Sequence, residues 1–364
     1  MTVTKGTRNL VVLVLALLSS LAYAGYYPEV VQGSDRMIAP TTSLEYDASG
    51  DPTIAYGDGA ENQVRLETKS GGTWSFETAD ARYPVELDHA IDTNGNVLIC
   101  YKAATNPGYT LFAAQRIGGA WSVSTVAKGV SASAVSCAYD LSHVPYVSHA
   151  YNGNLYLVKY SGGKWGSETV AQKVNPGEPS LVFDAAGKPA IAYYDNQLSG
   201  KAKLAYIKLA RKPGSKWSTE TAASAREFLR NPSLAFDPTT GEPMISYYVT
   251  KLSPTPGETR LATRSAGIWT TEFVANGWGT MRVDAAGNPR IGLRGSLPNN
   301  QVFVASRIGG VWTLEVVETS PNDYAYSTVS TALDSSGEVS LSYTYRTDVS
   351  APKDLRFASW VSAP

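Results

Sequence analysis

Two side chains in this sequence could exchange a proton with a bound molecule near neutral pH. A tyrosine recurs at one place in five segments of the chain, and His149 stands at that place in another. Tyr193 occupies the place in the segment that follows. Because imidazole titrates close to neutrality, we predict that His149 and Tyr193 are the catalytic acid–base pair if the protein is an enzyme. The alternative is that His149 only fills a packing position and bonds a loop carbonyl.

Other polar and aromatic side chains could hold a ligand without transforming it. Aromatic rings stack on sugar faces, and arginine, amide and carboxylate groups bond hydroxyls. Arg294 follows a leucine that replaces the recurring tyrosine, and Arg230 interrupts the pattern of its own segment. The predicted ligand-binding residues are Tyr83, Glu86, Glu178, Arg230, Asn231, Trp278, Arg294, Tyr326 and Arg346.

The sequence carries few signals for other chemistry. The three histidines form no HExxH pattern, and CxxC, calcium-loop, GxSxG and phosphate-loop patterns are absent. We therefore predict no metal and no cofactor. The 31 Lys and Arg residues are balanced by 32 Asp and Glu residues, which excludes the basic excess of a nucleic-acid-binding protein.

The elements that position these side chains come from an internal repeat. It reads apolar-x-apolar-Asp-x-x-Gly-x-Pro-x-Ile-x-Tyr and then, after a variable stretch, Gly-x-Trp-x-x-Glu-x-Val. The aspartates lie 44–53 residues apart, at Asp47, Asp92, Asp140, Asp184, Asp237, Asp284 and Asp334. The tryptophans are Trp74, Trp121, Trp165, Trp217, Trp269 and Trp312, so the seventh repeat lacks one. Residues 25–31, GYYPEVV, match the missing piece.

Each repeat contains four short runs of alternating apolar and polar residues, separated by turn residues, which indicates four β-strands. Four strands in 40–50 residues are typical of a propeller blade. We predict an all-β fold, a seven-bladed β-propeller with four-stranded blades, closed by the N-terminal strand. A horseshoe solenoid is the alternative. The predicted blades are approximately 41–80, 84–127, 131–171, 178–223, 231–276, 278–318, and 326–361 together with 25–31.

One face of this propeller is predicted to carry the function. The Asp-x-x-Gly and Gly-Gly turns are short and uniform, whereas the loops at the other ends of the strands vary in length and chemistry. Variable loops on a rigid scaffold are the usual location of binding sites. We expect the candidate residues to gather there, around the mouth of the central channel.

The N-terminus resembles an export signal. Lys5 and Arg8 precede an apolar run, and Ala22-Tyr23-Ala24 is a small-x-small cleavage site, so we predict a signal peptide over 1–24 and a single domain over 25–364. The protein is then secreted or periplasmic, with no membrane span after cleavage. An uncleaved anchor helix is the alternative. Because export leads to oxidising compartments, Cys100 and Cys137 are a disulfide candidate, and two buried thiols are the alternative.

At the level of the repeat, the chain resembles bacterial secreted β-propellers of the sialidase/BNR-repeat kind. Lys69-Ser70-Gly71-Gly72-Thr73-Trp74 keeps the Gly and Thr-Trp of that family's Asp-box, Ser-x-Asp-x-Gly-x-Thr-Trp. The box is degenerate, because Lys69 stands in the place of its aspartate. The resemblance implies carbohydrate-facing chemistry, and no catalytic residue transfers with it.

Three functions are compatible with these observations. The first is an exported binding protein that recognises a carbohydrate or another cell-surface ligand on the loop face. The second is a polysaccharide-active enzyme, either a lyase or a sialidase-like glycosidase. The third is an envelope scaffold with a protein partner. We favour binding over catalysis.

Overall fold

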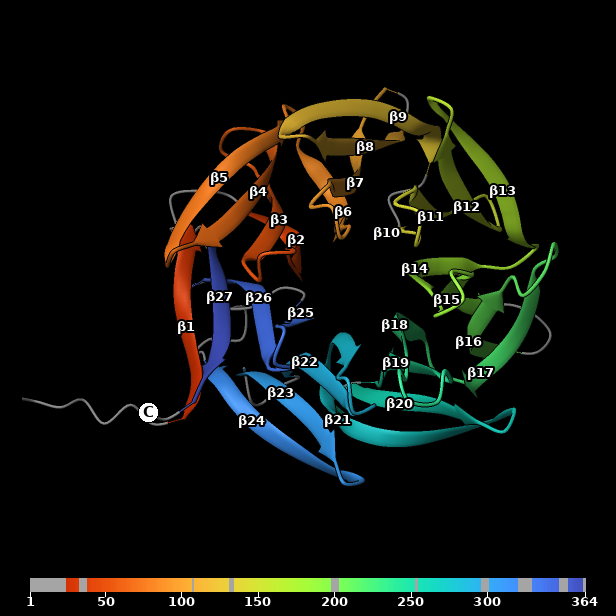
Figure 1. The fold of residues 1–364 in the computed structure, drawn as a ribbon. Helices are drawn as coiled ribbons and strands as arrows, with labels where there is room; N and C mark the ends of the chain where they lie inside the picture. The colour runs from red at the N-terminus through yellow and green to blue at the C-terminus, as the bar shows by residue number, and fades with distance from the viewer. Residues whose placement is uncertain are drawn as a thin grey trace, which may run out of the picture.

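The protein folds as strands arranged around a common axis (Figure 1). The structure, a computed structural model, describes residues 24–32, 38–106, 108–130, 134–197, 203–252, 255–295, 301–319, 329–346 and 353–362. Every regular element in these ranges is a strand. The predicted signal peptide lies almost entirely outside them, as does Tyr326. No helix among the described residues is long and apolar enough to cross a membrane.

Five sheets have four antiparallel strands each, with the inner strand nearest the axis. Their strands are β2 (Ile38–Tyr46), β3 (Pro52–Asp58), β4 (Gln63–Ser70) and β5 (Thr73–Asp80); β6 (Pro84–Ile91), β7 (Val97–Ala104), β8 (Tyr109–Ile117) and β9 (Ala120–Val130); β10 (Val135–Tyr139), β11 (Pro145–Tyr151), β12 (Asn154–Ser161) and β13 (Lys164–Gln172); β14 (Pro176–Phe183), β15 (Pro189–Gln197), β16 (Leu204–Arg211) and β17 (Ser218–Ala225); and β25 (Ser330–Leu333), β26 (Val339–Tyr345), β27 (Asp354–Val361) and β1 (Gly25–Gln32).

The remaining strands form one seven-stranded sheet. They are β18 (Leu229–Phe236), β19 (Pro243–Val249), β20 (Glu258–Ser265), β21 (Ile268–Val283), β22 (Pro289–Gly295), β23 (Gln301–Ile308) and β24 (Val311–Thr319).

The prediction of seven four-stranded blades is therefore wrong, because the structure has five four-stranded blades. The difference arises at β21, a 16-residue strand that pairs with β20 through its first part and with β22 through its second. The two repeats here are joined by Asn276 and Gly277 without a turn, so the backbone stays extended and the two sheets merge.

The Asp-x-x-Gly motif forms the predicted turn between the first two strands of a repeat. In the first copy, Oδ1 of Asp47 accepts the backbone N–H groups of Ser49 and Asp51, at 2.8 and 3.0 Å. Gly50 takes a φ of 82°, in the left-handed region that glycine enters without strain. His143 stands in the glycine place of the third copy, with a φ of 60°.

A ring of inter-sheet hydrogen bonds surrounds the axis. A short polar side chain on each inner segment accepts the N–H of a residue on the next, as Ser136 does from Leu181 at 3.1 Å. The ring closes where Ser330 accepts from Leu44 at 3.0 Å. The other acceptors are Ser43, Asp88, Ser180, Ser233 and Thr280. These bonds explain the small polar residue that precedes the apolar positions in most repeats.

The outer edges are held by the glutamate of the Gly-x-Trp-x-x-Glu motif. Oε2 of Glu220 accepts from Nε of Arg264 and from Nε1 of Trp269 on the following strands, both at 3.1 Å. Arg264 stands where the Asp-box would have its aspartate. A cation at that place therefore has a structural reason, because it pairs with the glutamate of the preceding repeat.

The N-terminal strand closes the propeller as predicted. β1 pairs antiparallel with β27, with Gly25 opposite Val361, and the two strands lie side by side in Figure 1. Glu29 also reaches the first blade, where it accepts from Nζ of Lys69 at 2.6 Å and from Nε1 of Trp74 at 3.2 Å. β1 therefore supplies both the missing outer strand and the missing glutamate.

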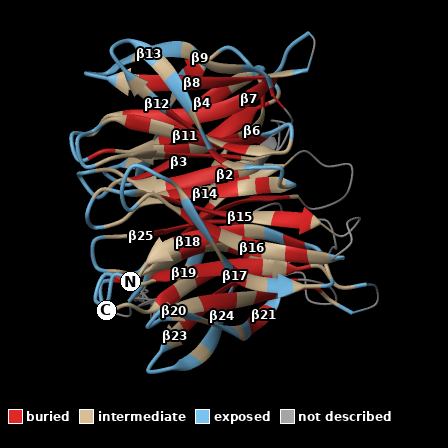
Figure 2. Ribbon diagram, turned by 90° about the vertical axis from the view of Figure 1, so that its right-hand side faces the viewer, coloured by how far each residue is buried: buried red, intermediate tan, exposed pale blue. Residues whose placement is uncertain are grey.

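The core is divided among the interfaces between neighbouring sheets. Most apolar clusters combine side chains of two sheets, and one joins the two halves of the seven-stranded sheet. The buried residues form continuous layers in Figure 2. The recurring tyrosines lie in these interfaces. Tyr56, Tyr101, Tyr193 and Tyr343 are all fully buried. They are packing residues of the repeat.

Candidate functional site

The mouth is the surface where the inner strands begin and the second strands of each repeat end. The inner strands β6, β14 and β18 each carry a β-bulge there. Glu178 and Asn231 sit at two of these bulges with φ of 48° and 47°. Such a backbone costs a non-glycine residue on the order of 1–3 kcal/mol and recurs at functional sites. The strain marks these two positions as candidates.

One side of the mouth contains buried groups of both charges. Glu86 lies opposite Lys102 in the β6–β7 ladder, so the two side chains share a face of the sheet. Burial, reinforced by the charge of Glu178, raises the pKa of Glu86 to about 7. Burial lowers the pKa of Lys102 to about 8, against the opposing effect of Glu86. Both groups therefore titrate close to neutrality.

His149 lies beside this pair, at the end of β11. Its side chain is only 3% exposed and stacks on Tyr156, with ring centroids 5.3 Å apart. Burial lowers the pKa of His149 to about 4, and the positive charge of Lys102 acts in the same direction. His149 is therefore neutral at pH 7 and could accept a proton.

Glu178, Arg230 and Asn231 form the next part of the mouth. Oε2 of Glu178 accepts the backbone N–H of Asn231 at 2.6 Å, and Oε1 lies 3.8 Å from Nη1 of Arg230. Burial raises the pKa of Glu178, and the Asn231 bond and the Arg230 charge oppose that shift. The Arg230 side chain is 54% exposed, so its guanidinium can reach a ligand.

An aromatic group follows on the seven-stranded sheet. The guanidinium of Arg294 lies over the Trp278 ring at 4.7 Å, from the opposite position in the β21–β22 ladder. Tyr248 meets the same ring edge-on, with centroids 5.5 Å apart. Cation–π and edge-to-face contacts of this kind fix the orientation of a half-buried ring.

The last part of the mouth is cationic. Burial lowers the pKa of Lys353, and the charges of Arg346 and Arg294 lower it further. Three positive side chains thus lie close enough to interact. An anion placed among them would stabilise all three charges.

Among the predicted residues, the structure brings Glu86, Glu178, Arg230, Asn231, Trp278, Arg294 and Arg346 to the mouth. Tyr83 lies half-buried just before β6, and burial raises its pKa.

The structure does not join His149 to Tyr193 by a hydrogen bond among the described residues. Tyr193 is fully buried in an apolar cluster with Leu157 and Leu181, and burial raises its pKa to about 12. Its catalytic role stays a prediction that this position does not favour.

The two cysteines are free thiols in the structure, so the candidate disulfide is not formed and the alternative of two buried thiols holds. Both belong to one buried apolar cluster between the second and third blades. Sγ of Cys137 lies 3.3 Å from the backbone oxygen of Asp88, which accepts from it. Burial raises the pKa of both thiols, which makes thiolate formation unfavourable.

The ligand-binding residues predicted from the sequence do not include Tyr194 and Tyr248. Tyr194 packs so closely on Gly177 that a Cβ there would collide with it, and the charges of Glu178 and Arg230 both act on its pKa. The omission has a simple cause. Successive residues of a strand face opposite ways, so the residue after each packing tyrosine is the one available to the mouth.

The described residues contain no group of three or more His, Cys, Asp or Glu side chains that could hold a metal ion. The arrangement is suited to binding a polar, partly anionic molecule. Groups with a pKa near neutrality on one side could also transfer protons.

No family model matches this chain, and no curated protein matches it. Solved structures do match. A protein of unknown function from Dyadobacter fermentans is 12% identical over 92% of this chain and 99% of its own, with a TM-score of 0.57. A polysaccharide lyase, an ulvan lyase bound to a GlcA-Rha3S saccharide, is 10% identical over 91% and 94%, with a TM-score of 0.62. The α-L-arabinofuranosidase Arb93A from Fusarium graminearum is 11% identical over 93% and 97%, with a TM-score of 0.52.

At these identities the likeness shows the fold alone. The chain is a β-propeller, of the same general architecture as several proteins whose names refer to glycans.

Proposed function

We propose that this protein is an exported carbohydrate-binding propeller that takes an acidic saccharide at its mouth. The observation that carries the proposal is that Arg294 lies over the Trp278 ring and that Arg294 and Arg346 are both close enough to Lys353 for their charges to lower its pKa. Cations bind the carboxylate or sulfate of an acidic sugar, and an aromatic ring contacts its apolar C–H surface. The names of the ulvan lyase and arabinofuranosidase neighbours support a glycan ligand.

The other side of the mouth would bind the hydroxyl groups of the same saccharide. Glu178 accepts hydrogen bonds and Arg230 donates them, and both are held at the strained bulges. A rigid arrangement of this kind reduces the entropy lost on binding.

The test is isothermal titration calorimetry of the protein with tetragalacturonate as an acidic probe. We expect the Arg230→Ala/Arg294→Ala double variant to bind about tenfold more weakly or worse, because two charge-assisted contacts are lost. The matched control is Lys128→Ala, an exposed lysine on β9 away from the mouth, which should bind like the wild type. Unchanged affinity in the double variant would contradict the mouth assignment and favour a protein-interaction scaffold.

A second candidate is a polysaccharide lyase, favoured by the pKa values near neutrality at Glu86 and Lys102. In β-elimination, a base removes the proton next to the uronate carboxylate. The electron pair left behind forms the ring double bond, and the bond to the leaving sugar oxygen breaks as that oxygen takes a proton from an acid. Neutral His149 is the proposed base, and a mouth cation would stabilise the carboxylate.

This second candidate is tested by incubating the protein with polyuronates and detecting unsaturated products by absorbance. His149→Tyr should abolish turnover while leaving the protein folded. Activity in that variant would remove His149 from the mechanism. Tyr193→Phe tests the predicted proton donor, and Tyr194→Phe tests the neighbour that lies against the mouth.

Export remains part of the proposal. Gly25 is the first residue of β1, so cleavage after Ala24 would leave the closing strand intact. N-terminal sequencing of protein recovered outside the cytoplasm should begin at Gly25, and a retained residue 1 would contradict cleavage.

A further inference from the structure

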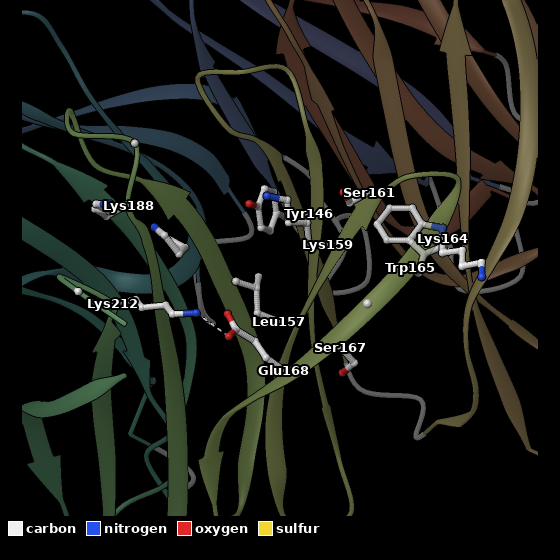
Figure 3. Close-up of a pocket in the computed structure, with 14 residues that line it drawn as sticks. Tyr146, Leu157, Lys159, Ser161, Lys164, Trp165, Ser167, Glu168, Lys188 and Lys212 are labelled. Carbon is white, nitrogen blue, oxygen red and sulfur yellow. Dashed lines mark hydrogen bonds and ion pairs between the residues drawn. The ribbon is translucent and has the colours of Figure 1, made fainter. Parts of the chain in front are cut away.

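A groove of about 680 Å³ lies on the outer part of the propeller, away from the mouth. It separates the β10–β13 blade from the β14–β17 blade (Figure 3). One wall comes from β11, β12 and β13, and the other from the turn at Gly187–Pro189 and the start of the β16–β17 loop. We call this feature the rim groove. Its volume lies in the range of ligand sites for small molecules.

The groove is open because the repeat pattern is broken at two places. Four other copies connect their outer strands by a Gly-Gly turn and one by Ala266-Gly267, whereas β16 and β17 are joined by the longer loop 212–217. Gly166 and Gly214 also line the groove without side chains. The longer loop and the two glycines therefore leave space at this interface.

The walls of the rim groove are strongly cationic. Lys159, Lys164, Lys188 and Lys212 line it, with Glu168 as the only acidic lining residue. Lys212 pairs with Glu168 at 2.6 Å, as the dashed line in Figure 3 shows. Lys159, Lys164 and Lys188 are exposed.

The carboxylates nearby belong to the turns. Oδ1 of Asp184 accepts the N–H of Ala186 and of Lys188, and its Oδ2 lies 3.9 Å from Arg211. Asp140 lies close enough to act on the pKa of Lys159 and holds its own turn in the same way. The exposed lysines therefore leave the groove with a net positive charge.

The groove also presents an aromatic ring. Tyr146 lines it half-buried, with Nζ of Lys159 at 5.3 Å from the ring centroid. Trp165 belongs to the same blade, but its ring faces the other way. Nε1 of Trp165 donates to Oγ of Ser124 on the preceding blade at 2.9 Å, and the ring packs on the apolar cluster between those two blades.

We propose that the rim groove is a second saccharide site, which binds a short segment of an anionic glycan. The Tyr146 ring contacts the C–H face of one sugar. The ammonium groups of Lys164 and Lys188 bind its carboxylate or sulfate groups, and the hydroxyl of Ser161 bonds its polar edge. This site is separate from the mouth and does not depend on it.

Two sites on one molecule would have a functional consequence. A long polysaccharide that engages both sites would bind more tightly than a short one, because the second contact becomes intramolecular. The rim groove would then hold the polysaccharide while the mouth binds or cleaves another part of it.

The test measures binding of dextran sulfate and tetragalacturonate oligomers to the full mature protein by calorimetry, with neutral dextran as the uncharged probe. Lys164→Ala/Lys188→Ala should weaken binding of an anionic probe about tenfold at low salt, since each exposed ionic contact contributes about threefold. Tyr146→Ala should weaken it by a similar factor. The two anionic probes show whether sulfate or carboxylate is preferred.

Matched variants separate a ligand contact from a loss of structure. Trp165→Ala removes a ring of the same blade that faces the preceding blade, and it should bind like the wild type. Arg230→Ala/Arg294→Ala should leave rim binding intact. Equal loss in Trp165→Ala and Tyr146→Ala would overturn the proposal, and so would unchanged binding in the lysine variant. Displacement of the oligosaccharide by polyglutamate at equal affinity would overturn the saccharide assignment.

Discussion

Replacing His149 by tyrosine should remove part of the protein's sensitivity to acid. The histidine is enclosed between two blades beside Lys102, and its protonation in the folded state is unfavourable. Tyrosine stands at the same place in five repeats, so the substitution restores the common packing residue. The variant should fold as the wild type does at pH 7.5.

The magnitude follows from the two pKa values. The folded state holds the pKa of His149 at about 4, whereas the solvent-exposed histidine of the unfolded chain has a pKa of 6.5. Between these values the unfolded chain binds the proton and the folded chain does not. Stability is therefore fully present above pH 6.5 and is lost as the pH falls toward 4. At pH 5.0 the loss from this one group is about 2 kcal/mol.

The assay is urea unfolding followed by tryptophan fluorescence at pH 7.5 and pH 5.0. The difference in unfolding free energy between His149→Tyr and the wild type should shift by about 2 kcal/mol in favour of the variant on going to pH 5.0. Tyr193→Phe is the control, because it alters the same column of buried residues and removes a hydroxyl whose pKa of about 12 lies outside this range. A shift of the same size in the control, or none in His149→Tyr, would refute the linkage.

Three further outcomes are expected. Deleting residues 25–31 should expose the edge of β27 and cause aggregation, measured by light scattering; a monomeric product would contradict the closing role of β1. Trp269→Phe should cost about 1 kcal/mol more than Trp312→Phe in urea unfolding, because only the first indole has a hydrogen-bond partner among the described residues. Equal costs would show that the hydrogen bond from Trp269 to Glu220 does not stabilise the protein. Gly177→Ala should push the Tyr194 ring out of place and weaken tetragalacturonate binding several-fold at unchanged secondary structure by circular dichroism, whereas full affinity would remove that ring from the site.

Much of the fold follows from local chemistry that a sequence displays. The Asp-x-x-Gly turns form because an aspartate at each turn can accept two nearby N–H groups, as Asp284 does from Ala286 and Asn288. The recurring Trp and Glu positions of the repeat are also visible in the sequence, and their spacing correctly predicted that β1 pairs with β27. These features depend on short-range geometry that repeats without change.

The features that the sequence did not predict are of two kinds. One is a turn that does not form between two repeats, and the other is a bulge that shifts the alternation of side chains along a strand. One blade was expected to end at Asn276 and the next to begin at Trp278, but no turn forms between them and β21 runs through. Bulges reverse the alternation of a strand, and nothing in the residues of 176–180 shows that Glu178 occupies one. For the same reason Tyr193 was selected as a site residue. Tyr193 is fully buried, and the neighbouring Tyr194 is the tyrosine that lies close to Glu178 and Arg230 at the mouth.

Because Gly25 pairs with Val361, the first strand can find its partner only after the last strand has been synthesised. Contacts between residues so far apart in the chain are slow to form and cannot exist before nearly all of the polypeptide has emerged. A chain interrupted before β27 would leave β1 without a partner and β26 paired on one side only. Only a chain that contains both ends can complete the blade that β1 and β27 share. A shortened product should therefore be more open to proteolysis than the complete ring.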